Sequence, residues 1–174
     1  GQVGKTKRNN TERFIYSTLT GGGSIPGASN PDLPADIACS NLKIVFILDE
    51  SGSIKGTATT QVRTGALALA NAIKNTGAEL RVVEFATTSS VVNLGGASVD
   101  NSFITNFNNY LNSSYSGQSY NPVSSGSCVG WTNWEDALED AQTQTADLVI
   151  FFTDGDPTAY NQSGSCGVRT PNDG

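Results

Sequence analysis

The sequence predicts an α/β protein with a mostly parallel β-sheet, and three observations support this fold class. Two apolar segments, LKIVFIL at 42–48 and DLVIFFTDGDPT at 147–158, are typical of strands that are buried on both faces. Several segments between them carry apolar residues at helical spacing. Strands that alternate with helices in this way favour a parallel sheet covered by helices.

The first half of this region contains one helix and one hairpin. Residues 57–75 form the first predicted helix, because their apolar residues fall on one helical face. Residues 78–86 and 89–94 are two strands separated only by Thr87 and Thr88, which predicts an antiparallel hairpin at the edge of the sheet.

The second half contains two further helices. Residues 100–112 have apolar and aromatic residues at helical spacing, and the polar stretch 113–130 is interpreted as a loop. Residues 132–144 form the last predicted helix. Thr132 is its expected N-cap, and Glu135, three residues later, completes a capping box. Together these elements predict a doubly wound, Rossmann-like sheet.

The N-terminal part of the chain differs from the rest in composition. Residues 1–38 are interpreted as an extension and linker, and the domain is expected to occupy 39–174. Within the extension, RFIYSTLT at 13–20 alternates like a short strand. The segment 21–34 is rich in Gly, Pro and Ser, as linkers are.

Composition excludes several functions. The net charge of −6 argues against a nucleic-acid partner, and no apolar run is long enough for direct membrane insertion. The chain has no histidine, which excludes Ser–His and Cys–His nucleophile pairs and histidine-bound zinc. Only 15% of the residues are charged, and the abundance of hydroxyl side chains indicates an extracellular or cell-surface protein.

Both buried strands end in a carboxylate, Asp49 in the first and Asp154 in the second. Ligands of such sheets bind at the carboxyl ends of the strands. Two carboxylates that meet there without a counter-charge are costly, and the first basic residue of the loop after Asp49 is Lys55. A divalent cation would neutralise them, and Ser51 and Ser53 add hydroxyl oxygens that suit Mg²⁺, Mn²⁺ or Ca²⁺.

Three short motifs resemble those of von Willebrand factor A-type domains, which include integrin I domains. DESGS at 49–53 matches the D-x-S-x-S motif after the first strand, and Thr132 in GWTNWEDAL matches a threonine in the turn before a helix. Asp154 in TDG matches the aspartate after the fourth strand. The resemblance covers about 42–158, with the motifs in the family's order.

This resemblance implies a metal-ion-dependent adhesion site. The cation would be Mg²⁺, with Mn²⁺ or Ca²⁺ as alternatives, held partly through water, and its open position would accept an oxygen donor from a protein or glycan partner. The domain would then bind its partner without catalysing a reaction. The implied metal ligands are Asp49, Ser51, Ser53, Thr132 and Asp154.

The chain departs from the family pattern after Asp154. The family fold continues with further helices and strands, so the domain is expected to be incomplete at its C-terminus and to belong to a larger parent protein or to contact neighbouring subunits. The strand at 147–158 would then be an exposed, apolar sheet edge. We expect residues 13–20, or another chain, to pair with it.

Each candidate ligand also has a structural interpretation. The DESGS segment could be only a turn followed by a helix cap, Thr132 only a cap, and Asp154 only a turn residue. Asp156 is interpreted as a turn residue, or as an acidic residue near the site that does not contact the metal. Four aromatic residues near the predicted site either contact a ligand or serve packing and loop structure: Tyr115, Tyr120, Trp131 and Trp134.

Two of the three cysteines lie near the predicted metal loops. A Cys128–Cys166 disulfide would close a loop of about 38 residues and stabilise the fold by about 3–4 kcal/mol on the chain-entropy model. The alternative is that both pair elsewhere or stay reduced. If Cys128 and Cys166 form the bridge, Cys39 is the odd cysteine and is expected to pair with a cysteine beyond residue 174.

The favoured function is metal-dependent adhesion, and two rival interpretations remain. In one, the domain is a structural subunit of a surface filament or assembly and mediates subunit contacts. The other is an aspartyl phosphotransferase of the haloacid dehalogenase type, which needs a second aspartate where this chain has Ser51. No matching lysine motif is evident either, so we expect no enzymatic activity.

Overall fold

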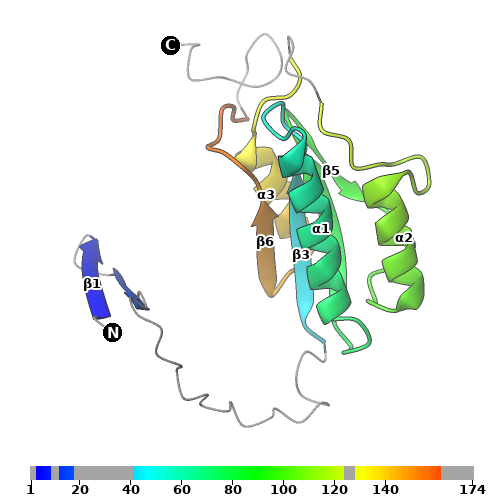
Figure 1. Ribbon diagram of the computed structural model, residues 1–174, viewed down its shortest axis with the longest axis horizontal. Helices are drawn as coiled ribbons and strands as arrows, with labels where there is room; N and C mark the ends of the chain where they lie inside the picture. Colours follow the sequence, from blue (N-terminus) through cyan, green and yellow to red (C-terminus); the bar gives the residue numbers. More distant parts are fainter. Residues whose placement is uncertain (1–2, 9–11, 18–40, 124–127, 162–174) are drawn as a thin grey trace. The chain divides into compact units, whose positions relative to one another are not determined.

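The computed structural model forms two compact units, 1–33 and 34–174, and each is described by itself. Figure 1 shows the course of the chain. No helix in the described part of the chain combines the length and the apolar character needed to cross a bilayer. The structure describes residues 3–8, 12–17, 41–123 and 128–161.

The N-terminal unit contains a β-hairpin. Strands β1 (Val3–Arg8) and β2 (Glu12–Ser17) pair antiparallel along their whole length in a sheet of their own. The short strand predicted at 13–20 is therefore present at 12–17. Its partner there is β1, a strand not anticipated from the sequence. The predicted pairing of residues 13–20, or of another chain, with the edge of the main sheet stays a prediction.

The larger unit is built on a four-stranded sheet in the order β5-β4-β3-β6. The central strand β3 (Lys43–Asp49) pairs parallel with β4 (Glu79–Phe85) and with β6 (Leu148–Phe152). The edge strand β5 (Ser89–Val92) pairs antiparallel with β4. These pairings confirm the predicted mostly parallel sheet with one antiparallel hairpin strand.

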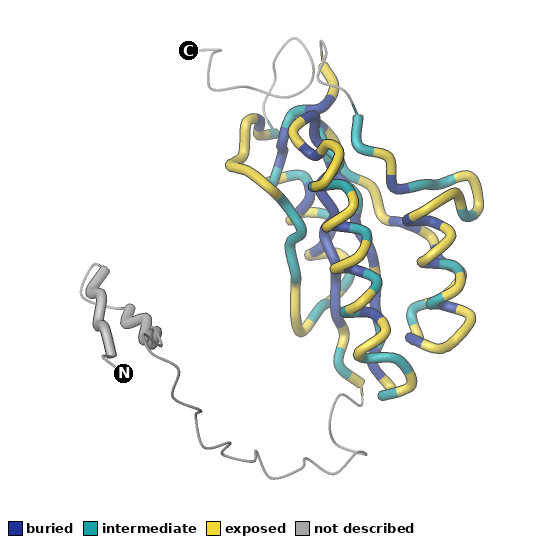
Figure 2. The backbone as a smooth tube through the Cα atoms, in the orientation of Figure 1, coloured by how far each residue is buried: buried dark blue, intermediate teal, exposed yellow. Residues whose placement is uncertain are grey.

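Helices cover both faces of this sheet, as the doubly wound prediction requires (Figure 1). Helices α1 (Thr57–Ala72) and α2 (Asn101–Asn112) pack on one face, and α3 (Trp134–Thr143) packs on the other. Burial on both sides explains why β3 is almost continuously apolar, and Figure 2 shows it as the buried centre of the unit.

The start of α3 differs from the prediction. Its N-cap is Asn133, whose Oδ1 accepts a hydrogen bond from the Asp136 N–H at 3.3 Å. The predicted Thr132 cap and its capping box are wrong, because the Thr132 carbonyl accepts hydrogen bonds from the N–H groups of Thr158 and Ala159. This tertiary pairing keeps Thr132 outside the helix.

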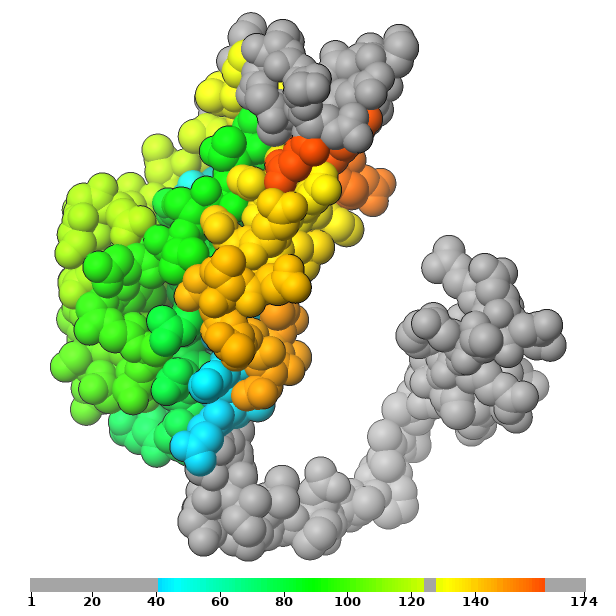
Figure 3. All heavy atoms as spheres, turned by 180° about the vertical axis from the view of Figure 1, so that it is seen from behind, coloured from blue at the N-terminus to red at the C-terminus, as the bar shows by residue number. Residues whose placement is uncertain are grey.

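Strand β6 lies at the edge of the sheet, with β3 as its partner on one side. Leu148 and Val149 are 44% and 39% exposed, although both are apolar. A largely apolar groove of about 700 Å³ runs between α3 and β6 and is lined by Leu138 and Val149 among others. Figure 3 shows this side of the molecule, with α3 and β6 in yellow to orange.

Removing the N-cap side chain of α3 should destabilise the protein more than removing that of α2. Asn133 is fully buried, and its amide also donates to the Thr87 carbonyl at 3.0 Å and to Asn161 Oδ1 at 2.8 Å. Asp100, the exposed cap of α2, accepts one bond, from the Phe103 N–H at 2.8 Å. We expect Asn133→Ala to lower the free energy of unfolding by about 2–4 kcal/mol and Asp100→Ala by about 1 kcal/mol. Chemical denaturation measures both, and equal losses would contradict the assigned role of Asn133.

Candidate metal centre

The side chain of Asp49 is held in one orientation at the end of β3. The residue is fully buried. Its Oδ1 accepts a hydrogen bond from the Ser51 N–H at 2.7 Å, and its Oδ2 accepts one from the Thr153 hydroxyl at 2.6 Å. The first bond is the local turn that the sequence allowed. The second bond joins β3 to the residue that follows β6.

Two serine hydroxyls continue this network toward Asp154. Ser51 Oγ and Ser53 Oγ lie 3.1 Å apart, and Ser53 Oγ donates to Asp154 Oδ1 at 2.8 Å. Asp49 and Ser51 are fully buried, whereas Ser53 and Asp154 are exposed. Four of the five predicted ligands therefore form one hydrogen-bonded group that reaches from the core to the surface.

The turn that contains Thr132 lies against the same loop. The Gly52 N–H donates to the Gly130 carbonyl at 2.8 Å, which ties the 130–132 turn to the DESGS segment. Thr132 is buried, and its own N–H donates to the Thr158 hydroxyl at 2.9 Å. Its described hydrogen bonds run to Thr158 and Ala159 and not to the serines. The metal role of Thr132 stays a prediction.

Acidic side chains surround Asp49. Within the described residues the one ion pair joins Arg81 to Glu79, so no basic side chain pairs with either carboxylate of the candidate site. Burial raises the pKa of the Glu50 carboxyl from 4.5 to about 7, although a hydrogen bond from Asn121 opposes the shift. The neighbouring carboxylates of Glu84 and Asp49 contribute to this rise in pKa, and the charge of Arg63 opposes it.

The donor set fits a hard divalent cation. The described residues contain no cluster of three or more His, Cys, Asp or Glu side chains that could hold a metal. The candidate site instead combines two carboxylates with hydroxyl groups, all of them oxygen donors of the kind that Mg²⁺, Mn²⁺ and Ca²⁺ prefer. A cation would also supply the counter-charge that the buried Asp49 lacks.

Tyr120 also supports the end of β3. It is 1% exposed, and its hydroxyl donates to the Asp49 carbonyl at 2.7 Å. Burial raises the pKa of Tyr120, so the hydroxyl keeps its proton and remains a donor. The guanidinium of Arg63 lies 5.7 Å from the centre of the ring and donates to the Tyr120 carbonyl at 3.0 Å.

The loop around Tyr120 is attached to the DESGS segment. The Val123 N–H donates to the Glu50 carbonyl at 2.8 Å, and the Asn121 N–H donates to the Glu50 side chain. Of the two interpretations of the 113–130 loop, a solvated connection does not describe this part. Tyr120 is one of two tyrosines in this mostly polar loop, and that was its sequence signal.

The remaining candidates near the site are two tryptophans, Asp156 and the cysteines. Trp134 packs against Phe151 with ring centres 5.7 Å apart, which agrees with its interpretation as a packing residue. The Trp131 N–H donates to the Thr87 hydroxyl at 3.1 Å, and Asp156 is exposed. The cysteines Cys39 and Cys166 lie outside the described residues, so the Cys128–Cys166 disulfide stays a prediction.

Thr153 was not anticipated as a functional residue. Its only signal was its position beside Asp154 in the TDG motif. Thr158 was missed as well, because its bonds to Thr132 join segments that are far apart in the sequence.

Residues 43–170 match the von Willebrand factor type A domain. The chain belongs to this family. No curated protein is similar enough in sequence to be counted as a relative. The match confirms the resemblance seen in the motifs. It also makes this chain a non-enzymatic domain, as expected.

Two solved structures of pilus proteins have a similar fold. One contains three N-terminal domains of the type V pili tip protein Mfa5 from Porphyromonas gingivalis, with a TM-score of 0.52, 14% identity and coverage of 70% of this chain. The other is the pilus adhesin SpaC from Lactobacillus rhamnosus GG, with a TM-score of 0.51, 20% identity and coverage of 79% of this chain. The matches span only 21% and 19% of those chains, and at these identities the likeness concerns the fold alone.

The position of Tyr120 generates a prediction about two tyrosines of one loop. Tyr120→Phe removes a buried hydrogen bond to the Asp49 carbonyl and should lower the free energy of unfolding by about 1–3 kcal/mol. Tyr115→Phe is the matched control. The Tyr115 hydroxyl accepts a bond from Asn106, which also donates to the Leu94 carbonyl, so the loss should be below about 1 kcal/mol. Denaturation of both variants in the presence of chelator tests this, and a larger loss for Tyr115→Phe would refute it.

Proposed function

We propose that this domain binds a divalent cation at the carboxyl edge of its sheet and uses the cation to hold a partner. The observation that carries the proposal is the group of oxygens joined by hydrogen bonds between the ends of β3 and β6. The preferred cation is Mg²⁺, with Mn²⁺ and Ca²⁺ as alternatives. The proposed ligands, direct or through water, are Asp49, Ser51, Ser53, Thr132 and Asp154.

The residues of the site divide into a buried and an exposed part. Asp49 is held in place by the Ser51 N–H and the Thr153 hydroxyl, so it needs little reorganisation to bind an ion. Ser53 and Asp154 are exposed and leave the site accessible to a partner. The bound cation would supply the positive charge that attracts a carboxylate or another oxygen donor from a protein or glycan.

The family and the structural relatives support an adhesive role at a cell surface. The two solved structures are a pilus tip protein and a pilus adhesin, and this domain covers about a fifth of each. We therefore propose that the domain acts extracellularly, as the binding module of a larger surface protein. The loops around the metal would select the partner.

A structural role in a filament or assembly is the second candidate. It is favoured by the exposed edge of β6 and the largely apolar groove between β6 and α3, which a neighbouring subunit could cover. Screening immobilised protein and glycan panels with Mg²⁺ and with chelator separates the two. Partner binding that persists in chelator would support the structural role and contradict metal-dependent adhesion.

Removing one anionic ligand should abolish most of the metal affinity. Asp49→Asn preserves the shape of the side chain but removes its charge. We expect the affinity for Mg²⁺ or Mn²⁺ to fall by about a hundredfold, since the charge of the ligands sets the affinity. The exposed Asp156→Asn, on the same turn as Asp154, should bind like the wild type. Titration calorimetry measures all three proteins, and equal heats for the wild type and Asp49→Asn would end the metal hypothesis.

The hydroxyl of Thr153 should matter for metal affinity without touching the metal. Thr153→Val keeps the size of the side chain but removes the hydrogen bond to Asp49 Oδ2. Loss of a residue that hydrogen-bonds to a metal ligand typically weakens metal binding by about 10–100-fold. Thr153→Ser retains the hydroxyl and should restore most of the affinity. A Thr153→Val protein with wild-type affinity would show that Asp49 is positioned without this bond.

A further inference from the structure

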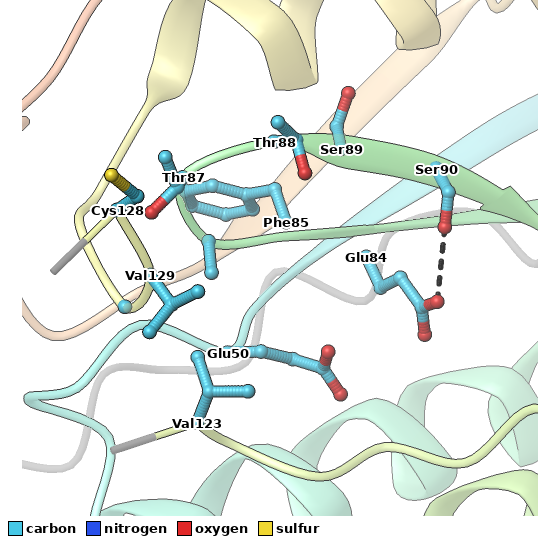
Figure 4. Close-up of a pocket in the computed structure, with 12 residues that line it drawn as sticks. Glu50, Glu84, Phe85, Thr87, Thr88, Ser89, Ser90, Val123, Cys128 and Val129 are labelled. Atoms are coloured by element: carbon cyan, nitrogen blue, oxygen red, sulfur yellow. Dashed lines mark hydrogen bonds between the residues drawn. The ribbon is translucent and has the colours of Figure 1, made fainter. Parts of the chain in front are cut away.

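A small cavity of about 270 Å³ lies beside the candidate metal loop (Figure 4). Residues 84–90, at the end of β4 and the turn into β5, form one wall. Val123 and the 128–130 segment form the other. Its volume is below the range of pockets that hold drug-sized molecules, so it suits a single side chain of a partner.

Two carboxylates from different strands face this cavity. Glu50 follows the end of β3 and Glu84 lies on β4, and Figure 4 shows both side chains extending into the same hollow. Glu84 accepts hydrogen bonds from the Ser90 hydroxyl at 3.0 Å and from the Tyr110 hydroxyl at 2.7 Å. Glu50 accepts one from the Asn121 N–H. Both carboxylates are therefore held in place by neutral donors.

No ion pair within the described chain neutralises these two carboxylates, although the charge of Arg63 acts on Glu50 from a distance and lowers its pKa. The one ion pair in the described part of the protein joins Arg81 to Glu79. The guanidinium of Arg63 is held over Tyr120 and does not line the cavity. A carboxylate that lacks an opposite charge in a partly enclosed space favours a cation from outside.

The remaining walls suit the stem of a long basic side chain. Val123 and Val129 contribute apolar surface, and Figure 4 shows them next to Glu50. Lysine and arginine bury an aliphatic stem against apolar surface while their charged ends reach polar groups. An acidic side chain would be repelled by the two carboxylates, and a neutral donor would gain a hydrogen bond without the charge attraction.

We propose that this cavity is a subsite for a lysine or arginine side chain of the partner. The assignment to the partner rests on the proposed adhesive function, because Glu50 and Gly130 belong both to this cavity and to the segments that form the candidate metal site. A partner segment that presents an oxygen donor to the metal could place a neighbouring basic side chain here. The preferred partner surface is then one that carries an acidic and a basic group close together.

Small probes test the cavity without knowledge of the partner. Butylammonium and butylguanidinium mimic the lysine and arginine side chains, and butanol is a neutral control of similar size. In chelator, backbone amide signals of Ser89, Ser90 and Val129 should shift saturably with the two cations and not with butanol. The absence of saturable shifts, or equal shifts with butanol, would overturn the proposal.

Two glutamate variants on β4 provide the matched comparison. Ser90 and Tyr110 donate to different oxygens of Glu84, so Glu84→Gln keeps one of the two acceptors and places an amide NH2 against the other hydroxyl. The variant removes the charge and should weaken binding of both cations by about tenfold. Glu79→Gln removes the same charge outside the cavity and should bind like the wild type. Equal binding by wild type and Glu84→Gln would refute the assignment. Because this experiment contains no metal, its result is independent of whether Asp49→Asn loses the metal.

Discussion

The buried carboxylate of Asp49 is the constraint on which the rest of the structure depends. A carboxylate at the end of a fully covered central strand loses its hydration, and no basic side chain in the described residues compensates for that loss. The protein surrounds it with neutral donors, the Ser51 N–H and the Thr153 hydroxyl. These donors fix the orientation of the group but do not neutralise it. An ordered group of oxygens without a basic partner is the feature from which the proposed cation binding is argued.

This constraint explains why distant parts of the chain meet at one edge of the sheet. Thr153 reaches Asp49 from the end of β6, and Tyr120 reaches its carbonyl from the loop after α2. Arg63 on α1 holds Tyr120 through both its ring and its carbonyl. The carboxyl end of β3 is thus supported by residues that also belong to the other elements of the domain. Changes in these supporting residues can therefore alter the site without touching a ligand.

The same edge carries more negative charge than a single cation requires. Glu50 follows Asp49 directly, yet its side chain lines the neighbouring cavity together with Glu84. The candidate metal loop and the cavity therefore share a wall. In the proposed function they differ in the groups that they attract, since a bound cation would recruit oxygen donors and the cavity would recruit basic groups. Two adjacent and complementary subsites would make recognition more selective than either subsite alone.

Much of the fold and part of the site follow from local sequence patterns. Continuous apolar strands and helical periodicity predict the α/β sheet, and the position of Asp49 and Asp154 after two such strands predicts that they meet, because parallel strands end at one edge. Only the tertiary structure decided which donors surround them. The N-cap of α3 is Asn133 and not the predicted Thr132, and Tyr120 is a buried residue that supports β3. Both differences result from hydrogen bonds between residues far apart in the chain. Such contacts depend on how the elements pack, and no local pattern encodes them.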